Sequence, residues 1–375
     1  MASATPELGA AFRRPDLARA ILDRLKMRLA RLGRPLRLME VCGTHTVAIS
    51  RSGLRSLLAP EVELVSGPGC PVCVTAQGEI DAMLELAGRS GVTVATFGDM
   101  MRVPGSNGSL NDARAAGARV AVVYSAMDAV ELAAETPGGN VVFLGVGFET
   151  TAPGTAIALE EAVRRAIPNF YVYCAHKLVP PALSALLGGG HGDLSLDGLV
   201  LPGHVSVVLG RRAYDFLAAY GVPAAIGGFE PVDILLAVDR VAAMVVEGRA
   251  GAENAYSRVV SEDGNSAARE AIGRCFAPVD AEWRGLGTLP GSGLALRDHL
   301  APHDAARRFG VSPVRVPEPR GCSCGAVLRG KTKPTDCALF GRRCRPEAPV
   351  GPCMVSTEGA CSAYYRFERG GRDHA

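Results

Sequence analysis

The chain has 375 residues, of which 48% are hydrophobic and 21% charged, and its formal net charge at pH 7 is +2. This composition is typical of a globular protein of two or three domains. The near-neutral charge and the 5% of aromatic residues give no sign of a nucleic-acid-binding surface. No apolar run reaches the roughly 18 residues of a membrane span, and no apolar leader begins the sequence. We therefore expect a cytoplasmic protein that binds neither nucleic acid nor membranes.

The first element expected along the chain is an amphipathic helix over residues 13–34. Apolar residues recur there at helical spacing from Leu17 to Leu29, with charged residues between them. We expect this helix to pack against the C-terminal part of the chain.

From residue 36 to about 230, apolar runs alternate with helix-like stretches. The eight runs begin near residues 36, 62, 92, 118, 140, 169, 197 and 223. Continuous apolar strands separated by helices predict parallel sheets covered on both faces, so the expected fold class is α/β. The expected division is an N-terminal helical segment (1–35), two similar parallel-sheet lobes (36–135 and 136–240), and a helical connection with a cysteine-rich third domain (241–375).

Each unusual motif of the sequence directly follows one of these runs. The candidate site residues are Cys42 and His45 in "CGTHT", Cys70 and Cys73 in "CPVC", Glu149, Thr150 and Thr151 in "GFETTAP", and His204 in "GHVS". Taken singly, such threonines are most often helix caps and such histidines satisfied polar residues. Because ligands bind at the carboxyl ends of parallel strands, we expect all of them to face one cleft between the lobes.

The C-x-x-C of Cys70 and Cys73 follows a Pro-Gly turn. A helix starting there would stabilise a thiolate with its N-terminal partial charge, which favours a redox-active pair over a structural one. The isolated Cys174 and Cys275 are interpreted as small buried side chains.

The third region begins with a stretch, 239–276, that is expected to be helical. It ends in a tail with six cysteines: Cys322, Cys324, Cys337, Cys344, Cys353 and Cys361. In a reducing compartment these favour metal binding over disulfides. Zinc sites usually use paired short knuckles, and the only short pair is Cys322–Cys324, so separate thiols among glycines and prolines favour an iron–sulfur cluster. Zinc and unligated thiols stay open as alternatives.

Together the motifs resemble the signatures of one family, the HypD hydrogenase maturation proteins. "MEVCGTHT", "SGPGCPVCVT", "GFETTAP", "LPGHVS", "GFEPVDIL" and the cysteine tail occur in order between residues 39 and 365. The resemblance implies two similar α/β domains and a third domain with a [4Fe-4S] cluster. The cluster pattern of the family falls on Cys324, Cys337, Cys344 and Cys361. Cys353 would take part in thiol exchange beside the cluster, and Cys322 has no assigned role.

The resemblance also implies a function: a [NiFe]-hydrogenase maturation factor that acts as a scaffold for assembly of the Fe(CN)2CO unit. It would act with the chaperone HypC and accept cyanide from HypE, which carries it as a thiocyanate made by HypF. Cys42 would hold the iron transiently, and Gly43 would let a partner's backbone approach it. His45 would orient ligands or move protons, and Cys70 and Cys73 would exchange electrons with the cluster. Whether the protein is an enzyme in its own right stays open.

Two other classes of protein are compatible with the residues. A cluster-coupled disulfide reductase, resembling ferredoxin:thioredoxin reductase in its chemistry, would use the cluster and the C-x-x-C but would have no use for Cys42. A zinc-stabilised binding module would contain zinc and no visible chromophore. The iron content of the purified protein distinguishes these classes.

Overall fold

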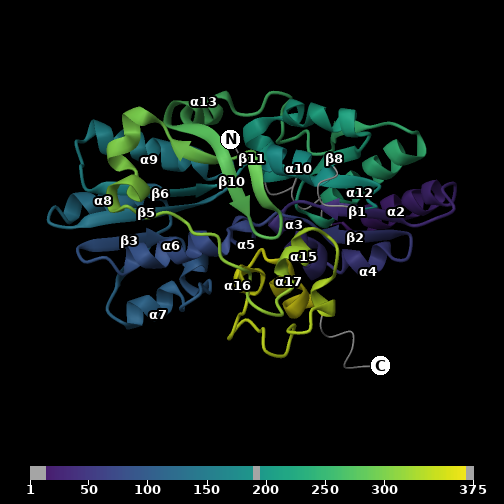
Figure 1. Ribbon diagram of the computed structural model, residues 1–375. Helices are drawn as coiled ribbons and strands as arrows, with labels where there is room; N and C mark the ends of the chain where they lie inside the picture. Colours follow the sequence, from purple (N-terminus) through teal and green to yellow (C-terminus); the bar gives the residue numbers. More distant parts are fainter. Residues whose placement is uncertain (1–13, 189–194, 369–375) are drawn as a thin grey trace.

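The computed structural model describes residues 14–188 and 195–368 (Figure 1). It is an α/β protein with two parallel sheets, a two-stranded antiparallel hairpin and a cysteine-rich tail. Residues 1–13, the start of the expected N-terminal segment, lie outside the described residues.

All eight expected strands are confirmed. They are β1 (Leu36–Glu40), β2 (Val62–Ser66), β3 (Val92–Thr96), β4 (Arg119–Val122), β5 (Asn140–Gly147), β6 (Phe170–His176), β7 (Gly198–Pro202) and β8 (Pro223–Gly227). Most of their residues are buried, because helices cover both faces of each sheet (Figure 1).

The strands are not divided between the two sheets in chain order. The five-stranded sheet has the order β2-β1-β7-β8-β9, where β9 is Gly251–Asn254, and the four-stranded sheet has the order β4-β3-β5-β6. The predicted division into lobes at 36–135 and 136–240 is therefore wrong. The chain begins in the five-stranded sheet, builds the whole four-stranded sheet, and then returns. Similar apolar runs reveal that strands exist but not which strands pair.

The helices that follow these strands match the expected alternation. They are α3 (Gly43–Arg51), α4 (Leu54–Leu58), α5 (Pro71–Val74), α6 (Gln77–Ala87), η1 (Gly98–Arg102), α7 (Leu110–Ala115), α8 (Ala126–Glu135), α9 (Ala152–Arg164), α10 (Val179–Leu187), α11 (Gly203–Leu209), η2 (Arg211–Tyr220) and α12 (Pro231–Val246). One apolar core cluster contains residues of both sheets, the hairpin and the tail, so the lobes share a core.

The N-terminal helix, α2 (Pro15–Leu29), packs against α12 of the five-stranded lobe (Figure 1). Its buried residues join the core between α12 and that sheet, and Arg24 Nη2 lies 2.6 Å from a carboxylate oxygen of Asp239. The prediction that this segment packs on the cysteine-rich domain is therefore wrong. Leu17 is 38% exposed, so the buried stripe begins one turn later, at Ile21.

The expected helical stretch 239–276 is interrupted. After α12 the chain adds strand β9 and then forms α13 (Ser266–Cys275), and the sequence reading missed a long hairpin of β10 (Phe276–Trp283) and β11 (Gly287–Leu296). The hairpin forms an isolated bridge to Thr75, next to the "CPVC" motif, and another to Lys177, at the end of β6. It therefore connects both lobes (Figure 1).

The cysteine-rich tail follows η3 (Asp298–His303) and α14 (Ala305–Phe309). It contains α15 (Cys324–Leu328), η4 (Pro334–Asp336), α16 (Pro352–Val355) and α17 (Ala360–Phe367). α17 contacts α3, and both α15 and α16 contact α5 (Figure 1). The tail thus lies on the two helices that follow β1 and β2.

We predict that Leu25→Ala lowers the free energy of unfolding by about 2–4 kcal/mol, because Leu25 is 2% exposed and its loss leaves a cavity between α2 and α12. Met27→Ala on the same helix is the control, since Met27 is 69% exposed and its replacement should change stability by about 0.5 kcal/mol at most. Chemical denaturation measures both. Equal effects of the two variants would contradict the placement of α2.

Candidate functional site

Cys42 lies at the point where β1 ends and α3 begins. It occupies the N-cap position of α3, and its side chain is only 7% exposed. Burial raises the pKa of the thiol to about 12, although the backbone of His45 and Thr44 in the first turn of α3 lowers it, without a capping hydrogen bond to the sulfur. The site therefore holds a protonated thiol by itself, and a bound cation would shift it to the thiolate.

A buried carboxyl group supports the turn around Cys42. Glu40 Oε2 accepts a hydrogen bond from the backbone N–H of Cys42 (3.3 Å), and Glu40 Oε1 accepts one from Thr46 Oγ1 (2.6 Å). Burial raises the pKa of Glu40 to about 7. These bonds hold the end of β1 and the first turn of α3 in one fixed conformation.

His45 and His204 are brought together by a phenylalanine. The ring centroid of Phe229 lies 3.9 Å from that of His204 and 4.9 Å from that of His45. The three residues follow β7, β8 and β1, which are neighbours in the five-stranded sheet. Cys42, His45 and His204 therefore follow neighbouring strands of one sheet, whereas the sequence predicted that they belong to two lobes. That all candidate residues face one cleft stays a prediction.

The tautomer of His45 follows from its hydrogen bond. His45 Nε2 lies 2.8 Å from the carbonyl oxygen of Gly228, so Nε2–H donates, and Nδ1 is buried without a hydrogen-bond partner among the described residues. Burial lowers the pKa of His45 to about 4, so the ring is neutral near pH 7. Nδ1 therefore keeps a lone pair that can accept a proton or a hydrogen bond. His204, in contrast, is exposed.

Cys70 and Cys73 lie directly beside this turn. They form a disulfide across the N-terminus of α5, with their Cα atoms 5.2 Å apart, and both are buried. The backbone N–H of Gly43 donates to the carbonyl of Gly69 (2.8 Å), and a Cβ on Gly69 would overlap the backbone of Cys42. Glycine is therefore required at Gly69 for the two motifs to meet.

The "GFETTAP" residues follow β5 of the four-stranded sheet, not a strand of the sheet that carries Cys42. Thr150 is exposed, and Thr151 occupies the N-cap position of α9 without a capping bond from its side chain. Glu149 is 1% exposed; its Oε1 accepts the backbone N–H of Val179 (2.9 Å), while Oε2 lacks a partner in the described part of the chain. Burial raises the pKa of Glu149 to about 7.

Five of the six tail cysteines line one pocket. They are Cys322, Cys324, Cys337, Cys344 and Cys361, and the sixth, Cys353, is fully buried beside it. Hydrogen bonds from the thiols of Cys324 and Cys361 lower the pKa of Cys353. Within residues 14–188 and 195–368, no group of three or more His, Cys, Asp or Glu side chains is placed to hold a metal ion.

These thiols nevertheless fit an iron–sulfur cluster by their chemistry and by the pocket they share. The four cysteines with the family's cluster spacing all line it, and each ligand of such a cluster binds a different iron atom. Cys322 lines the same pocket, so the pocket alone does not select four of the five.

The tail cysteines are also close to the disulfide. α15 carries Cys324, α16 carries Cys353, and both helices contact α5. Buried Arg284, from the hairpin turn, donates to the carbonyl of Thr75 (3.1 Å) and lowers the pKa of Cys353 further. The disulfide therefore lies on one side of the contact between α5 and the tail, and the thiol-lined pocket lies on the other side.

Sequence reasoning missed Phe229 and Glu358 as residues of the site. Phe229 lies in "GGFEP", a motif already recognised at a strand end, so its ring could have been named. Glu358 comes from the tail between Cys353 and Cys361, and its carboxylate contacts Thr44 of "CGTHT". No sequence pattern relates two residues 314 positions apart.

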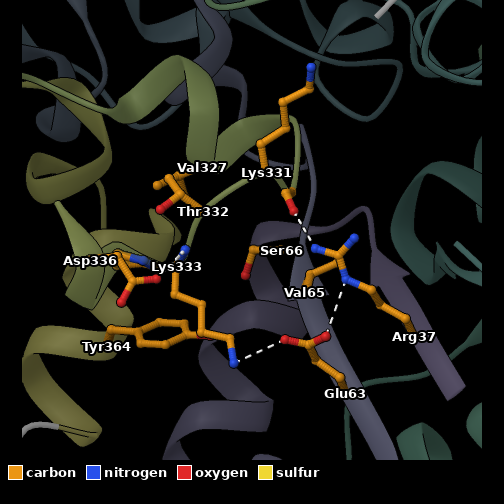
Figure 2. A pocket seen from close by; sticks show the side chains of 12 residues that line it. Arg37, Glu63, Val65, Ser66, Val327, Lys331, Thr332, Lys333, Asp336 and Tyr364 are labelled. Carbon is orange, nitrogen blue, oxygen red and sulfur yellow. Dashed lines mark hydrogen bonds and ion pairs between the residues drawn. The ribbon is translucent and has the colours of Figure 1, made fainter. Parts of the chain in front are cut away.

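A separate polar pocket lies between β2 and the tail (Figure 2). Glu63 of β2 pairs there with Arg37 Nε (3.2 Å) and Lys333 Nζ (2.9 Å), and Arg37 Nη2 donates to the carbonyl of Gly330 (2.8 Å). Figure 2 shows Lys331 extending away from the Glu63 carboxylate. These pairs attach the tail to the edge of the five-stranded sheet.

The fold and the site define an α/β protein with a buried strand-end thiol at a sheet edge where two histidines and a disulfide also lie, and with a thiol-lined pocket in the tail that packs there. The profile of the HypD family, described as "Hydrogenase formation hypA family", matches residues 16–368. The chain belongs to this family.

Several curated proteins are similar to the chain over nearly its full length. Hydrogenase maturation factor HypD of Rhodobacter capsulatus is 47% identical over 366 residues, which is 95% of this chain and 97% of that protein. The proteins of the same name from Azotobacter vinelandii (48% identical, 90% of each chain) and Escherichia coli strain K12 (44% identical, 96% of this chain and 97% of that protein) are also similar. In the described ranges, no helix has the length and apolar character needed to span a membrane.

We predict that Glu149→Gln stabilises the protein at pH 8 but not at pH 5. The pKa of Glu149 is raised from 4.5 to about 7 in the folded state, so its protonated form contributes stability below about pH 4.5 that is lost as the pH rises through 7. Glutamine keeps the oxygen that accepts from Val179 and removes the buried charge. The expected gain at pH 8 is about 1–3 kcal/mol in the free energy of unfolding.

Chemical denaturation at the two pH values measures this difference. Exposed Glu135 of α8 supplies the matched control, Glu135→Gln. A gain from Glu149→Gln that is the same at pH 5 and pH 8 would show that the charge is not the cause.

Proposed function

We propose that this protein is a [NiFe]-hydrogenase maturation factor that serves as a scaffold for assembly of the Fe(CN)2CO unit. The observation that carries the proposal is the Cys42 turn: a buried thiol at a helix N-terminus, with His45, His204 and a disulfide around it. Membership of the HypD family, whose similar proteins are named hydrogenase maturation factors, supports the same role.

Cys42 is the residue proposed to hold the iron. Thiolate sulfur is a suitable ligand for iron that also carries CO and cyanide. Coordination to the iron would displace the thiol proton, which the high pKa otherwise retains, and the charge of the metal ion would stabilise the thiolate. The neutral ring of His45 has a free Nδ1 lone pair to accept that proton or to orient a ligand.

The proposed partners are the chaperone HypC, which shares the iron, and HypE, which delivers cyanide made available by HypF. Cys42 is buried, whereas His204, whose ring stacks on Phe229 near His45, is exposed. An approach of these partners from the His204 side is therefore the route that the site supports.

The proposed resident cofactor is a [4Fe-4S] cluster held by Cys324, Cys337, Cys344 and Cys361. A cluster of this kind would supply one-electron redox chemistry. Reduction of the Cys70–Cys73 disulfide takes two electrons and two protons and yields two thiols. The contacts of α15 and α16 with α5 support electron exchange between the tail and this pair.

We predict that the protein purified without oxygen is brown and contains about four irons per chain from the tail cluster. Cys324→Ala, Cys337→Ala, Cys344→Ala and Cys361→Ala, each made singly, should lose iron and colour, while Cys322→Ala should retain both. Iron analysis and visible absorption measure this. A colourless protein containing one zinc would overturn the cluster assignment and favour a zinc-stabilised binding module.

We also predict that Cys42→Ala abolishes hydrogenase maturation in cells while leaving the fold and the tail cluster intact. The complex with HypC, purified without oxygen, should lose the infrared bands of iron-bound CO and cyanide, because the proposed iron ligand is gone. The matched control is Cys174→Ala in β6, whose thiol lies away from this turn and donates to the carbonyl of Leu294.

Infrared spectra of the wild-type and variant complexes decide between two classes. Full-strength bands in Cys42→Ala would exclude Cys42 as the iron ligand. If the wild-type complex itself carries no such bands but the cluster reduces the disulfide, the protein is a disulfide reductase and not an assembly scaffold.

A further inference from the structure

The tail forms a direct contact with the Cys42 turn. Thr44 Oγ1 donates a hydrogen bond of 2.6 Å to Glu358 Oε1. A Cβ added to Gly43 would lie 2.6 Å from the Cβ of Glu358 and 2.8 Å from its carbonyl oxygen, so backbone and side chain of the tail fill this space. The sequence predicted that Gly43 leaves room for a partner's backbone; the structure places the chain's own Glu358 there.

We propose that Glu358 is a positioning residue of the Cys42 site, which fastens the tail over the turn and limits access to the thiol. The inference rests on the proposed function, in which Cys42 is the reacting thiol. Glu358 does not bind Cys42; it acts through Thr44, which lies in the first turn of α3, two residues after Cys42.

The loop that carries Glu358 is itself firmly held. Its residues, 356–359, are named the latch loop here. Ser356 Oγ (3.1 Å) and the backbone N–H of Thr357 (3.3 Å) both donate to Asp99 Oδ2, and the N–H of Glu358 donates to Ser356 Oγ (3.2 Å). Asp99 lies in η1, after a strand of the four-stranded sheet. The four-stranded lobe therefore holds the latch loop, and Glu358 of this loop bonds to Thr44 of the five-stranded lobe.

The latch loop also connects the two tail helices that carry buried cysteines. It runs from α16, which carries Cys353, to α17, which carries Cys361. A Cβ on Gly359 would overlap the carbonyl of Cys353, so the loop turns back tightly on α16. The latch loop joins the two helices that carry these cysteines. The position of Glu358 relative to Thr44 therefore depends on how this part of the tail folds.

Glu358 has two separable effects on Cys42. Its hydrogen bond holds the latch loop in place, and its negative charge raises the pKa of the Cys42 thiol. Glu358→Gln keeps the oxygen that accepts the hydrogen bond and removes the charge. Thr44→Val removes the hydroxyl donor and leaves the charge of Glu358. The two substitutions therefore distinguish positioning from electrostatics.

The test is the rate at which iodoacetamide alkylates Cys42 in the full-length protein, purified without oxygen and without partner, and followed by mass spectrometry of the Cys42 peptide. We expect Glu358→Ala and Thr44→Val each to raise this rate roughly tenfold, because a hydrogen bond to a carboxylate is lost. Thr44→Ser should stay near the wild-type rate, and Glu358→Gln, which loses the charge but keeps the hydrogen bond, should rise much less than Glu358→Ala. The double variant Glu358→Ala/Thr44→Val should be no faster than either single variant. Glu347→Ala, at an exposed tail position, is the control.

Two results would overturn the proposal. If Glu358→Gln is as fast as Glu358→Ala while Thr44→Val is as slow as the wild type, only the charge acts on Cys42. If all variants alkylate at the wild-type rate, the latch loop does not limit access. Thermal unfolding and the visible spectrum of each variant identify any that fails to fold. Because alkylation is measured without partner or bound CO and cyanide, a failure here is distinct from a failure of the scaffold function, which the infrared bands report.

Discussion

The pairing of β1 with β7 is the contact on which the rest of the molecule depends. Met39 of β1 lies between Val65 of β2 and Leu199 of β7, so strands from distant parts of the chain form one parallel sheet. Parallel strands end at a common edge, and the motifs that follow β2, β1, β7 and β8 therefore meet there. The disulfide, the Cys42 turn, His204 and Phe229 are neighbours because of this strand order.

At the strand ends that carry the candidate residues, burial has the largest effect on the chemistry of the ionisable groups. Cys42, Glu40 and Glu149 each have a raised pKa, and the pKa of His45 is lowered, in every case with burial as the largest cause. All four groups are thereby biased toward their neutral forms. Without a bound ion, these neutral groups produce only a weak electrostatic field. A bound cation would change their protonation strongly, because electrostatic interactions are stronger where the local dielectric constant is low.

Much of the fold was predictable from local pattern. The eight strands and the helices between them follow from apolar runs and their spacing, and Cys42, His45, Cys70 and His204 follow from their positions at strand ends. The distribution of strands between sheets was not predictable, because pairing is decided by packing between elements far apart in sequence. For the same reason, the packing of α2 against α12 and the contact of Glu358 with Thr44 could not be predicted. The hairpin was missed because β10 and β11 include exposed, charged and glycine-rich positions that resemble a loop.

The order of the strands also has a consequence for the newly made chain. Arg37 at the start of the first sheet bonds to Asp197, 160 residues later, whereas the four-stranded sheet is formed entirely by residues in between. At a synthesis rate of about 5–20 residues per second, β7 is synthesised roughly ten to thirty seconds after β1. During that interval its apolar edge is exposed, while the inserted sheet can already close. Nascent chains of this protein are therefore at their most vulnerable to aggregation before residue 200 emerges from the ribosome.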